Sequence, residues 1–194
     1  MNIILASASK RRSSILDSCG IRHRVVVSGI KEKMKGAKPG YLAAVNARLK
    51  AENVSRKLKN GFIIGADTVV LLGKKITGKP RNAVHARKML KSMAGKTISV
   101  YTGLCVMDAA TGRSAAGWER SKVRVKKIKP QDMSRYFKLL RPYDKAGGFS
   151  IEGAGSFIFD NIEGSYFNVL GLPMAKLYGL FKKLDADLLD IVRE

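Results

Sequence analysis

Residues 5–16 read LASASKRRSSIL, and the rest of the chain is arranged around this stretch. A short apolar strand, residues 3–6, runs into small hydroxyl residues, three consecutive cations and an apolar helical face. Ser9 is a favoured N-cap residue, so we expect a helix that begins at Lys10. A strand, a tight turn and a helix N-terminus direct free N–H groups and the positive end of the helix dipole at one point. The pattern predicts either an anion-binding turn or a solvated basic junction, because the glycine-rich P-loop pattern is absent.

The composition is that of a globular protein with an unusual charge. The chain has 194 residues, of which 45% are hydrophobic, so we expect one domain over residues 1–194, or two lobes that share a core. It carries 37 Lys and Arg against 15 Asp and Glu, a net charge of +22. This charge predicts attraction to nucleic acid, acidic surfaces or phosphorylated small molecules. Because the cations are spread along the chain, we expect weak non-specific polyanion binding rather than a specific nucleic-acid partner.

The two cysteines and the apolar runs indicate the compartment. Cys19 and Cys105 lie far apart among apolar neighbours and lack a CxxC spacing, which is typical of reduced core residues. No apolar run approaches the roughly 20 residues of a membrane span. The short apolar run before the first cations also differs from a signal peptide. We therefore expect a cytoplasmic protein without a membrane partner.

A second informative stretch, FIIGADTVVLL at residues 62–72, places a carboxylate inside an apolar strand. Burying ionised Asp67 is costly unless a cation or strong donors compensate it. One interpretation is a structural ion pair with an Arg or Lys, and the other is a metal ligand or general base. Lys50 lies on a small-residue face of an expected helix, where a lysine usually extends its ammonium to water.

Periodicity and turn residues predict strands that alternate with helices, which indicates an α/β fold. The expected strands are residues 3–6, 21–30, 62–72 and 97–107, followed by a strand pair through Trp118 and Val125. The expected helices span residues 9–19, 41–58 and 82–95, a stretch after Pro130 that reaches residue 140, and residues 173–184. The cations Lys122, Arg124 and Lys126 alternate with valines along one expected strand, which makes that strand the best local candidate for polyanion contact.

In chain order, these motifs resemble those of the Maf family of nucleoside triphosphate pyrophosphatases. The opening LASASKRR is similar to the family's LAS-x-S-P-R-R, and GADTVV matches a family motif without change. Further segments that resemble family motifs lie at residues 76–80, 142–153 and 162–173, so the resemblance covers about residues 3 to 184. Two of the departures from the pattern fall on acidic or substrate-selecting positions. Lys31 replaces one acid of a (D/E)E pair, and Glu152 stands where many members have Gln.

The resemblance implies a fold and a reaction. The fold is that of the inosine triphosphatase-like enzymes, with a long mixed sheet, flanking helices and a cleft between two lobes. The reaction is hydrolysis of a nucleoside triphosphate to the monophosphate and pyrophosphate, a house-cleaning role in the nucleotide pool. A homodimer is also implied.

The resemblance also implies roles for ten residues. They are Asp67 as general base; Glu32 and Asp67 as ligands of a divalent cation; Ser7, Ser9, Arg12, Lys50 and Lys79 around the phosphates; and Arg11, Thr68 and Glu152 at the substrate-selecting positions. Oxygen ligands and phosphates suit Mg²⁺ or Mn²⁺. The two histidines, His23 and His85, are too few to indicate zinc.

The selecting positions favour a pyrimidine substrate. The family branch that acts on dTTP and UTP has Arg, Thr and Gln there, and Arg11 and Thr68 match it. The branch that acts on 7-methyl-GTP has Trp, Gln and Glu, and Glu152 matches that one. The alternatives are therefore 7-methyl-GTP specificity, a basic nucleic-acid-binding module without catalysis, or a regulatory protein of cell division. The nucleic-acid-binding alternative leaves the carboxylate inside residues 62–72 unexplained, and a role in cell division could coexist with an enzyme activity.

Overall fold

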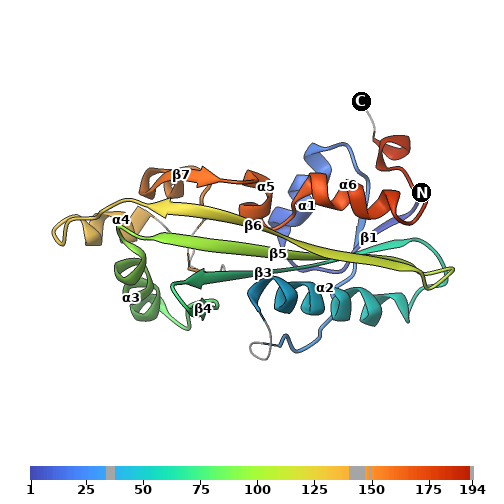
Figure 1. Ribbon diagram of the computed structural model, residues 1–194, viewed down its shortest axis with the longest axis horizontal. Helices are drawn as coiled ribbons and strands as arrows, with labels where there is room; N and C mark the ends of the chain where they lie inside the picture. Colours follow the sequence, from blue (N-terminus) through green and yellow to red (C-terminus); the bar gives the residue numbers. More distant parts are fainter. Residues whose placement is uncertain (34–37, 140–146, 149, 193–194) are drawn as a thin grey trace.

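The structure, a computed structural model, describes residues 1–192 except 34–37, 140–146 and 149. Within these residues one mixed sheet of seven strands forms the centre of the molecule, in the order β2-β1-β3-β5-β6-β7, with β4 paired to β3 (Figure 1). Strand β1 is parallel to β2 and β3, and the other pairings are antiparallel. The expectation of a mixed sheet flanked by helices is confirmed. Parts of the expected loop 31–38 and of the segment 142–153 lie outside the described residues.

The elements have the following bounds. The strands are β1 (Ile3–Leu5), β2 (Arg24–Val25), β3 (Phe62–Leu72), β4 (Lys75–Thr77), β5 (Thr97–Asp108), β6 (Ser114–Val125) and β7 (Phe159–Glu163). The α-helices are α1 (Lys10–Ser18), α2 (Pro39–Ser55), α3 (Ala83–Met93), α4 (Met133–Leu139), α5 (Tyr166–Leu170) and α6 (Met174–Lys182). Two 3₁₀ helices complete the described chain, η1 (Gly153–Ile158) and η2 (Leu188–Ile191).

Helix α2 covers one face of the sheet, and α1, α5 and α6 cover the other (Figure 1). The α2 face is closely packed because two glycines leave room for the helix backbone. A Cβ atom at Gly65 would lie 2.0 Å from the Ala47 oxygen, and one at Gly103 would lie 2.1 Å from the Ala43 carbonyl carbon. Side chains alternate between faces along a strand, so Asp67 shares the α2 face with Gly65. Thr68 lies on the opposite face.

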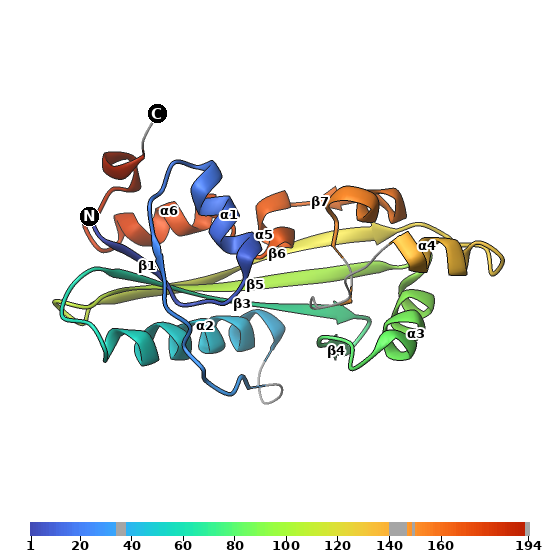
Figure 2. The same ribbon diagram turned by 180° about the vertical axis from the view of Figure 1, so that it is seen from behind.

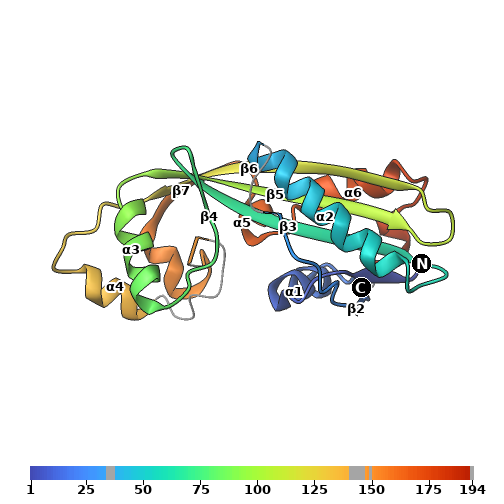
Figure 3. The same ribbon diagram turned by 90° about the horizontal axis from the view of Figure 1, so that it is seen from below.

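The long strands β3, β5 and β6 join two ends of the molecule. At one end lie α1, α2 and α6, and at the other lie α3, α4, β4 and β7 (Figures 2 and 3). The larger apolar cluster spans both ends on the face opposite α2, from Ile3 and Leu16 to Leu90 and Ile158. A smaller cluster fills the space beneath α2. Buried Cys105 belongs to that smaller cluster, and burial raises the pKa of its thiol to about 12, so it stays protonated. Both cysteines are free thiols, as expected.

One edge of β3 is covered in two separate pieces. Strand β1 pairs with residues 62–64, and β4 pairs with residues 70–72, while β5 covers the whole opposite edge. In the described chain no strand pairs with residues 65–69 on the side of β1 and β4. This gap lies at Asp67 and Thr68, and it gives access to both faces of the sheet at one point.

Several short elements differ from the expectations. The expectation of a strand over residues 21–30 is wrong, since only β2 and an isolated bridge between Ile21 and Val192 form there. Its exposed valines, Val25 and Val27, pack against no core, so their β propensity is insufficient to extend the strand. Strands β4 and β7 and helix α5 were not expected, because three to five residues are too few to show a period.

Candidate functional site

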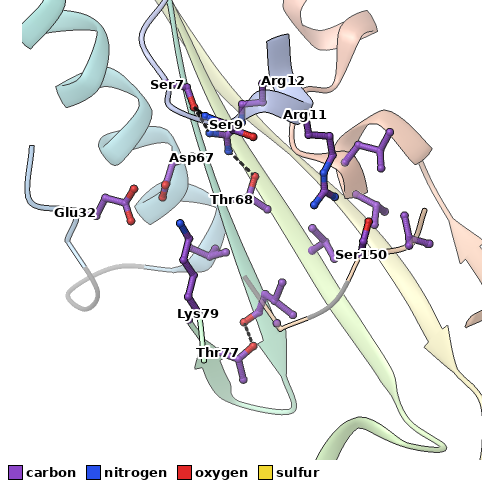
Figure 4. Close-up of a pocket in the computed structure, with 18 of the residues that line it drawn as sticks. Ser7, Ser9, Arg11, Arg12, Glu32, Asp67, Thr68, Thr77, Lys79 and Ser150 are labelled. Atoms are coloured by element: carbon purple, nitrogen blue, oxygen red, sulfur yellow. Dashed lines mark hydrogen bonds between the residues drawn. The ribbon is translucent and has the colours of Figure 1, made fainter. Parts of the chain in front are cut away.

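A pocket of about 970 Å³ opens at the gap in the sheet, and all ten residues singled out from the sequence line it. Its polar end is formed by the turn before α1, by α2 and by the middle of β3 (Figure 4). Its other end is apolar and lies against the sheet face opposite α2. The apolar lining includes Leu90, Met93, Ile98, Val100, Val123, Val125 and Ile158. The pocket therefore joins a charged region to a hydrophobic one.

Lys50 lies between the two carboxylates of the site. Its Nζ atom donates to Glu32 Oε1 at 2.6 Å, to Asp67 Oδ1 at 2.8 Å and to the Ala66 oxygen at 3.2 Å. The side chain of Lys50 does not extend to water, because the residue is only 7% exposed. The compensating cation that buried Asp67 requires is thus Lys50, about three turns from the start of α2. Charge pairing and three oxygen acceptors offset the cost of burying the ammonium.

Asn46 is the second side chain that donates to Asp67, and it was not identified as a site residue from the sequence. Its Nδ2 atom donates to Asp67 Oδ2 at 2.9 Å and to the Lys33 oxygen at 2.9 Å, while its Oδ1 atom accepts from the Lys33 nitrogen at 2.8 Å. The amide thereby fastens the segment that carries Glu32 to α2. Its spacing from Lys50 could have indicated this role, because residues four apart on a helix share a face and Asn46 precedes Lys50 by four.

Arg12 joins the turn before α1 to β3. Its Nη1 atom donates to Ser7 Oγ at 2.9 Å, its Nη2 atom to Thr68 Oγ1 at 3.0 Å and its Nε atom to the Gly171 oxygen at 2.7 Å. Burial lowers the pKa of the Arg12 guanidinium, and the nearby charges of Asp67 and Glu32 oppose that shift. A guanidinium remains cationic in proteins, so Arg12 brings a positive charge to the pocket wall.

Ser9 and Lys79 face the pocket from opposite sides. Ser9 occupies the N-cap position of α1 as expected, but its side chain makes no capping hydrogen bond. Its backbone nitrogen donates instead to Ser7 Oγ at 3.3 Å. Lys79 follows β4, is exposed, and extends toward Glu32 and Asp67 in Figure 4. The polar end of the pocket thus presents two serines and three cations around two carboxylates.

Arg11 and Glu152 form an ion pair on the far side of Thr68. Arg11 Nε lies 3.1 Å from Glu152 Oε2, and Ser150 Oγ donates to the same carboxylate oxygen at 3.1 Å. The Glu152 side chain is 43% exposed, while that of Arg11 is 16% exposed. Two of the three substrate-selecting positions are therefore in direct contact, and Glu152 holds the guanidinium of Arg11.

The oxygen atoms around Lys50 Nζ show what cation this site suits. Glu32, Asp67 and the Ala66 carbonyl together form an all-oxygen set, which hard divalent cations prefer. The described residues contain no cluster of three or more His, Cys, Asp or Glu side chains that could hold a metal alone. Mg²⁺ is commonly held by one or two carboxylates and completed by water and substrate phosphates. The residues present therefore fit Mg²⁺ or Mn²⁺ held by Glu32 and Asp67 together with a triphosphate.

The sequence profile of the Maf-like protein family matches residues 2–184. The chain belongs to the Maf-like family. This membership confirms the resemblance found in the motifs, and with it the expectation of an enzyme. In the described residues no helix is long and apolar enough to cross a membrane.

Several bacterial relatives carry the name dTTP/UTP pyrophosphatase. The relative from Caldicellulosiruptor saccharolyticus is 38% identical and covers 96% of each chain. The relative from Carboxydothermus hydrogenoformans is 40% identical over 92% of this chain and 96% of its own length, and that from Desulforamulus reducens is 41% identical over 90% and 92%. Among solved structures the chain is similar to the Ham1 protein of Staphylococcus aureus, at 13% identity and a TM-score of 0.47 over 66% of this chain and 74% of that one. The family assignment rests on the sequence matches rather than on this partial likeness.

Proposed function

We propose that this Maf-like protein hydrolyses pyrimidine nucleoside triphosphates, dTTP and UTP above all, to the monophosphate and pyrophosphate. The observation that carries the proposal is buried Asp67, whose two carboxylate oxygens each accept one hydrogen bond inside a pocket rich in cations. A carboxylate oxygen has about two acceptor sites, so each oxygen keeps one for a water molecule. The names of the relatives support the same substrate class.

In this proposal the polar end of the pocket binds the triphosphate. Ser7, Arg12 and the N-terminus of α1 donate to phosphate oxygens from one side, and Lys79 does so from the other. Mg²⁺ or Mn²⁺ held by Glu32 and Asp67 would neutralise part of the phosphate charge. Lys50 keeps both carboxylates oriented and lowers the cost of holding two negative charges close together.

Asp67 acts as the general base on the attacking water. Its carboxylate accepts one proton while the water oxygen forms a bond to the α-phosphorus. The bond between the α-phosphorus and the oxygen that bridges to the β-phosphate breaks, and its electron pair leaves with pyrophosphate. The donors that line the phosphate region stabilise the charge that develops on the leaving group.

The geometry at Glu152 favours the pyrimidine alternative over 7-methyl-GTP. A carboxylate that recognised a purine would need acceptor sites directed at the base edge. Glu152 Oε2 instead accepts from both Arg11 and Ser150, so this oxygen mainly positions Arg11. The proposal includes a homodimer, which the family resemblance implies, and a cytoplasmic location, which the two unpaired cysteines favour. The net charge of the protein gives weak, salt-dependent binding to polyanions without sequence preference.

The proposal is tested by pyrophosphate release from a nucleotide panel with Mg²⁺, using the wild type and Asp67→Asn. We expect dTTP and UTP to be turned over fastest and Asp67→Asn to lose roughly 10²–10⁴-fold in kcat, the usual cost of losing a general base. Asp185→Asn is the matched control, because Asp185 is exposed, lies outside the pocket and has a φ of +57° that Asn tolerates. Unchanged turnover in folded Asp67→Asn would contradict the assignment of the base.

A further inference from the structure

A chain of hydroxyl groups runs from the pocket into the sheet at Thr68. Thr68 on β3 lies opposite Thr102 on β5, and their Oγ1 atoms are 3.0 Å apart. The backbone groups of Phe62 and Ile64 point to the β1 side of β3. Because backbone groups alternate in direction along a strand, the N–H and C=O of Thr68 also point away from β5. The backbones of Thr68 and Thr102 are therefore not hydrogen-bonded to each other, and in such a pair the side chains lie close together.

The direction of the protons in this chain follows from its buried end. Thr102 Oγ1 donates to the backbone oxygen of Asn168 at 2.9 Å, and a carbonyl oxygen can only accept. The single proton of the Thr102 hydroxyl is therefore committed to Asn168. Because the Thr102 oxygen can then only accept from Thr68, the Thr68 proton points to Thr102 and away from the pocket.

Arg12 fixes the remaining side of the Thr68 hydroxyl. Its Nη2 atom donates to Thr68 Oγ1 at 3.0 Å, and a guanidinium has no acceptor that could take the Thr68 proton instead. Thr68 thus uses its proton toward Thr102 and one lone pair toward Arg12. One lone pair remains, so toward the pocket Thr68 can accept a hydrogen bond but cannot donate one.

Asn168 makes the buried end of this chain rigid. The residue is fully buried, and its side-chain oxygen accepts from the Thr102 nitrogen at 3.1 Å. Its Nδ2 atom donates to the Val100 oxygen at 3.1 Å and to Ser121 Oγ at 2.9 Å. Every side-chain polar atom of Asn168 thus has a partner, and the carbonyl that receives the Thr102 proton is held in place.

We propose that Thr102, through Thr68, determines which pyrimidine the pocket accepts. Thr102 is a positioning residue that never touches the base; it keeps Thr68 a pure acceptor, suited to the N3–H group of uracil or thymine. Cytosine carries a lone pair at N3, which would face the lone pair of Thr68 and leave both unpaired in a desolvated site. The inference rests on the proposed function in taking a pyrimidine nucleotide as the ligand.

The test replaces Thr102 with Val, which has the same shape and no hydroxyl. In Thr102→Val the Thr68 proton has no acceptor in the sheet, so it can turn to the pocket and donate to cytosine N3. The backbone oxygen of Asn168 keeps the hydrogen bond from the Gly171 nitrogen at 3.0 Å, so the variant leaves no orphaned carbonyl there. Thr102→Ser, which retains the hydroxyl, is the matched control.

The measurement is the dissociation constant of UMP and of CMP by calorimetry, together with kcat/KM for UTP and CTP. We expect the wild type and Thr102→Ser to prefer the uracil nucleotides, and Thr102→Val to lose about tenfold of that preference, mainly by gaining affinity for CMP. An equal change for both nucleotides in Thr102→Val, or a wild type without preference for UMP, would overturn the inference.

The two proposals fail in different ways. A wild type that releases no pyrophosphate from any triphosphate refutes the proposed reaction, while the ratio of UMP to CMP binding still tests Thr102. Conversely, the wild type could hydrolyse dTTP and UTP while Thr102→Val binds UMP and CMP in the wild-type ratio. That result would support the proposed reaction and refute the proposed role of Thr102. Circular dichroism of each variant verifies that the fold is retained.

Discussion

Asp67 and Thr68 are neighbours in β3, yet their side chains lie on opposite faces of the sheet in two different kinds of network. Asp67 is surrounded by charged or strongly polar partners from α2, namely Lys50 and Asn46. Thr68 belongs to a neutral hydroxyl chain that ends at a backbone carbonyl, with one cation, Arg12, at its pocket side. Both side chains reach one pocket because β1 and β4 leave the edge of β3 open between them.

The difference separates two tasks that a nucleotide enzyme has to perform. A charged network such as that of Asp67 can hold a cation, orient a carboxylate and accept a proton, and its energies are large. A neutral hydroxyl chain contributes little charge but fixes the direction of a proton, which distinguishes donors from acceptors on a base. Alternation along one strand keeps the two networks on opposite faces of the sheet.

The largest effect on the charged network is expected from a substitution that pushes α2 away from the sheet. In Gly103→Ala the new Cβ would lie 2.1 Å from the Ala43 carbonyl carbon, so the helix backbone has to shift. We expect a loss of at least about 1–3 kcal/mol in the free energy of unfolding, as for other overpacked sites. The shift also displaces Asn46 and Lys50 from Asp67, so turnover falls. Urea denaturation and pyrophosphate release measure the two effects.

Gly117→Ala is the control for that substitution. It lies on neighbouring β6, where a Cβ atom would meet Lys176 Cδ at 3.7 Å and Leu180 Cδ2 at 3.9 Å, both ordinary contacts. Gly117→Ala should leave stability unchanged or raise it slightly, because Ala restricts the unfolded chain. Equal stability of the Gly103 and Gly117 variants would show that α2 does not rest on the sheet as closely as described.

A second prediction separates the charged network from the neutral one. Asn46→Leu removes the donor to Asp67 Oδ2 and the two hydrogen bonds to the Lys33 backbone. Leaving such buried groups unpaired costs about 1–3 kcal/mol, so kcat should fall roughly 10–100-fold. The loss should be equal for UTP and CTP, since the hydroxyl chain at Thr68 is untouched. Steady-state kinetics with both nucleotides measures it.

Asn53→Leu provides the matched control on the same helix. The Oδ1 atom of Asn53 is buried and makes no hydrogen bond within the described residues, so its removal breaks nothing there. We expect near wild-type turnover for this variant. If Asn46→Leu behaved like Asn53→Leu, or if it altered the ratio of UTP to CTP turnover, the separation of the two networks would be wrong.

The long elements of the fold were predictable because their signals are local. The strand over residues 62–72 was expected at its observed bounds, since a predominantly apolar run between Gly61 and Gly73 leaves few alternatives. Asn82 caps α3 as expected and accepts from the His85 nitrogen at 2.8 Å. Strand β4 was not predictable in the same way, because its pairing depends on the two-residue turn after β3 rather than on its own pattern.

The candidate site was predictable in its residue types but not in its partnerships. The carboxylate in an apolar strand pointed to Asp67, the run of cations after β1 pointed to Arg12, and the family resemblance pointed to Lys79. Lys50 can bridge Asp67 and Glu32 because α2 lies very close to the sheet. That close approach depends on Gly65 and Gly103, which lie 15 and 53 residues after Lys50 in the chain. Contacts of this kind follow from tertiary packing, so no local pattern predicts them.

The smallest expected effect concerns the edge of the pocket at Glu152. In Glu152→Gln the ion pair with Arg11 is lost, while an amide oxygen can still accept from Ser150. The amide nitrogen can donate to O4 of uracil or thymine, which a carboxylate cannot do. The guanidinium of Arg11, held less firmly, can also turn toward a carbonyl of the base. Both changes favour O4 of uracil and thymine, whereas the lost carboxylate could accept from the amino groups of cytosine and guanine. Turnover of dTTP and UTP should therefore rise relative to CTP and GTP, by up to about tenfold for one polar contact.

The matching control for this last prediction is Glu163→Gln. Glu163 is exposed, and its hydrogen bond from Lys122 holds the pKa of its carboxyl below the ordinary value, so this variant also breaks an ion pair. It lies on β7 away from the pocket lining, and it should leave all nucleotide ratios unchanged. Unaltered ratios in Glu152→Gln would mean that Glu152 has no influence on the choice of base, and the prediction would be wrong. A strong wild-type preference for 7-methyl-GTP would instead mean that Glu152 faces the base itself. In that case the ion pair with Arg11 would open on binding, and the purine alternative would be correct.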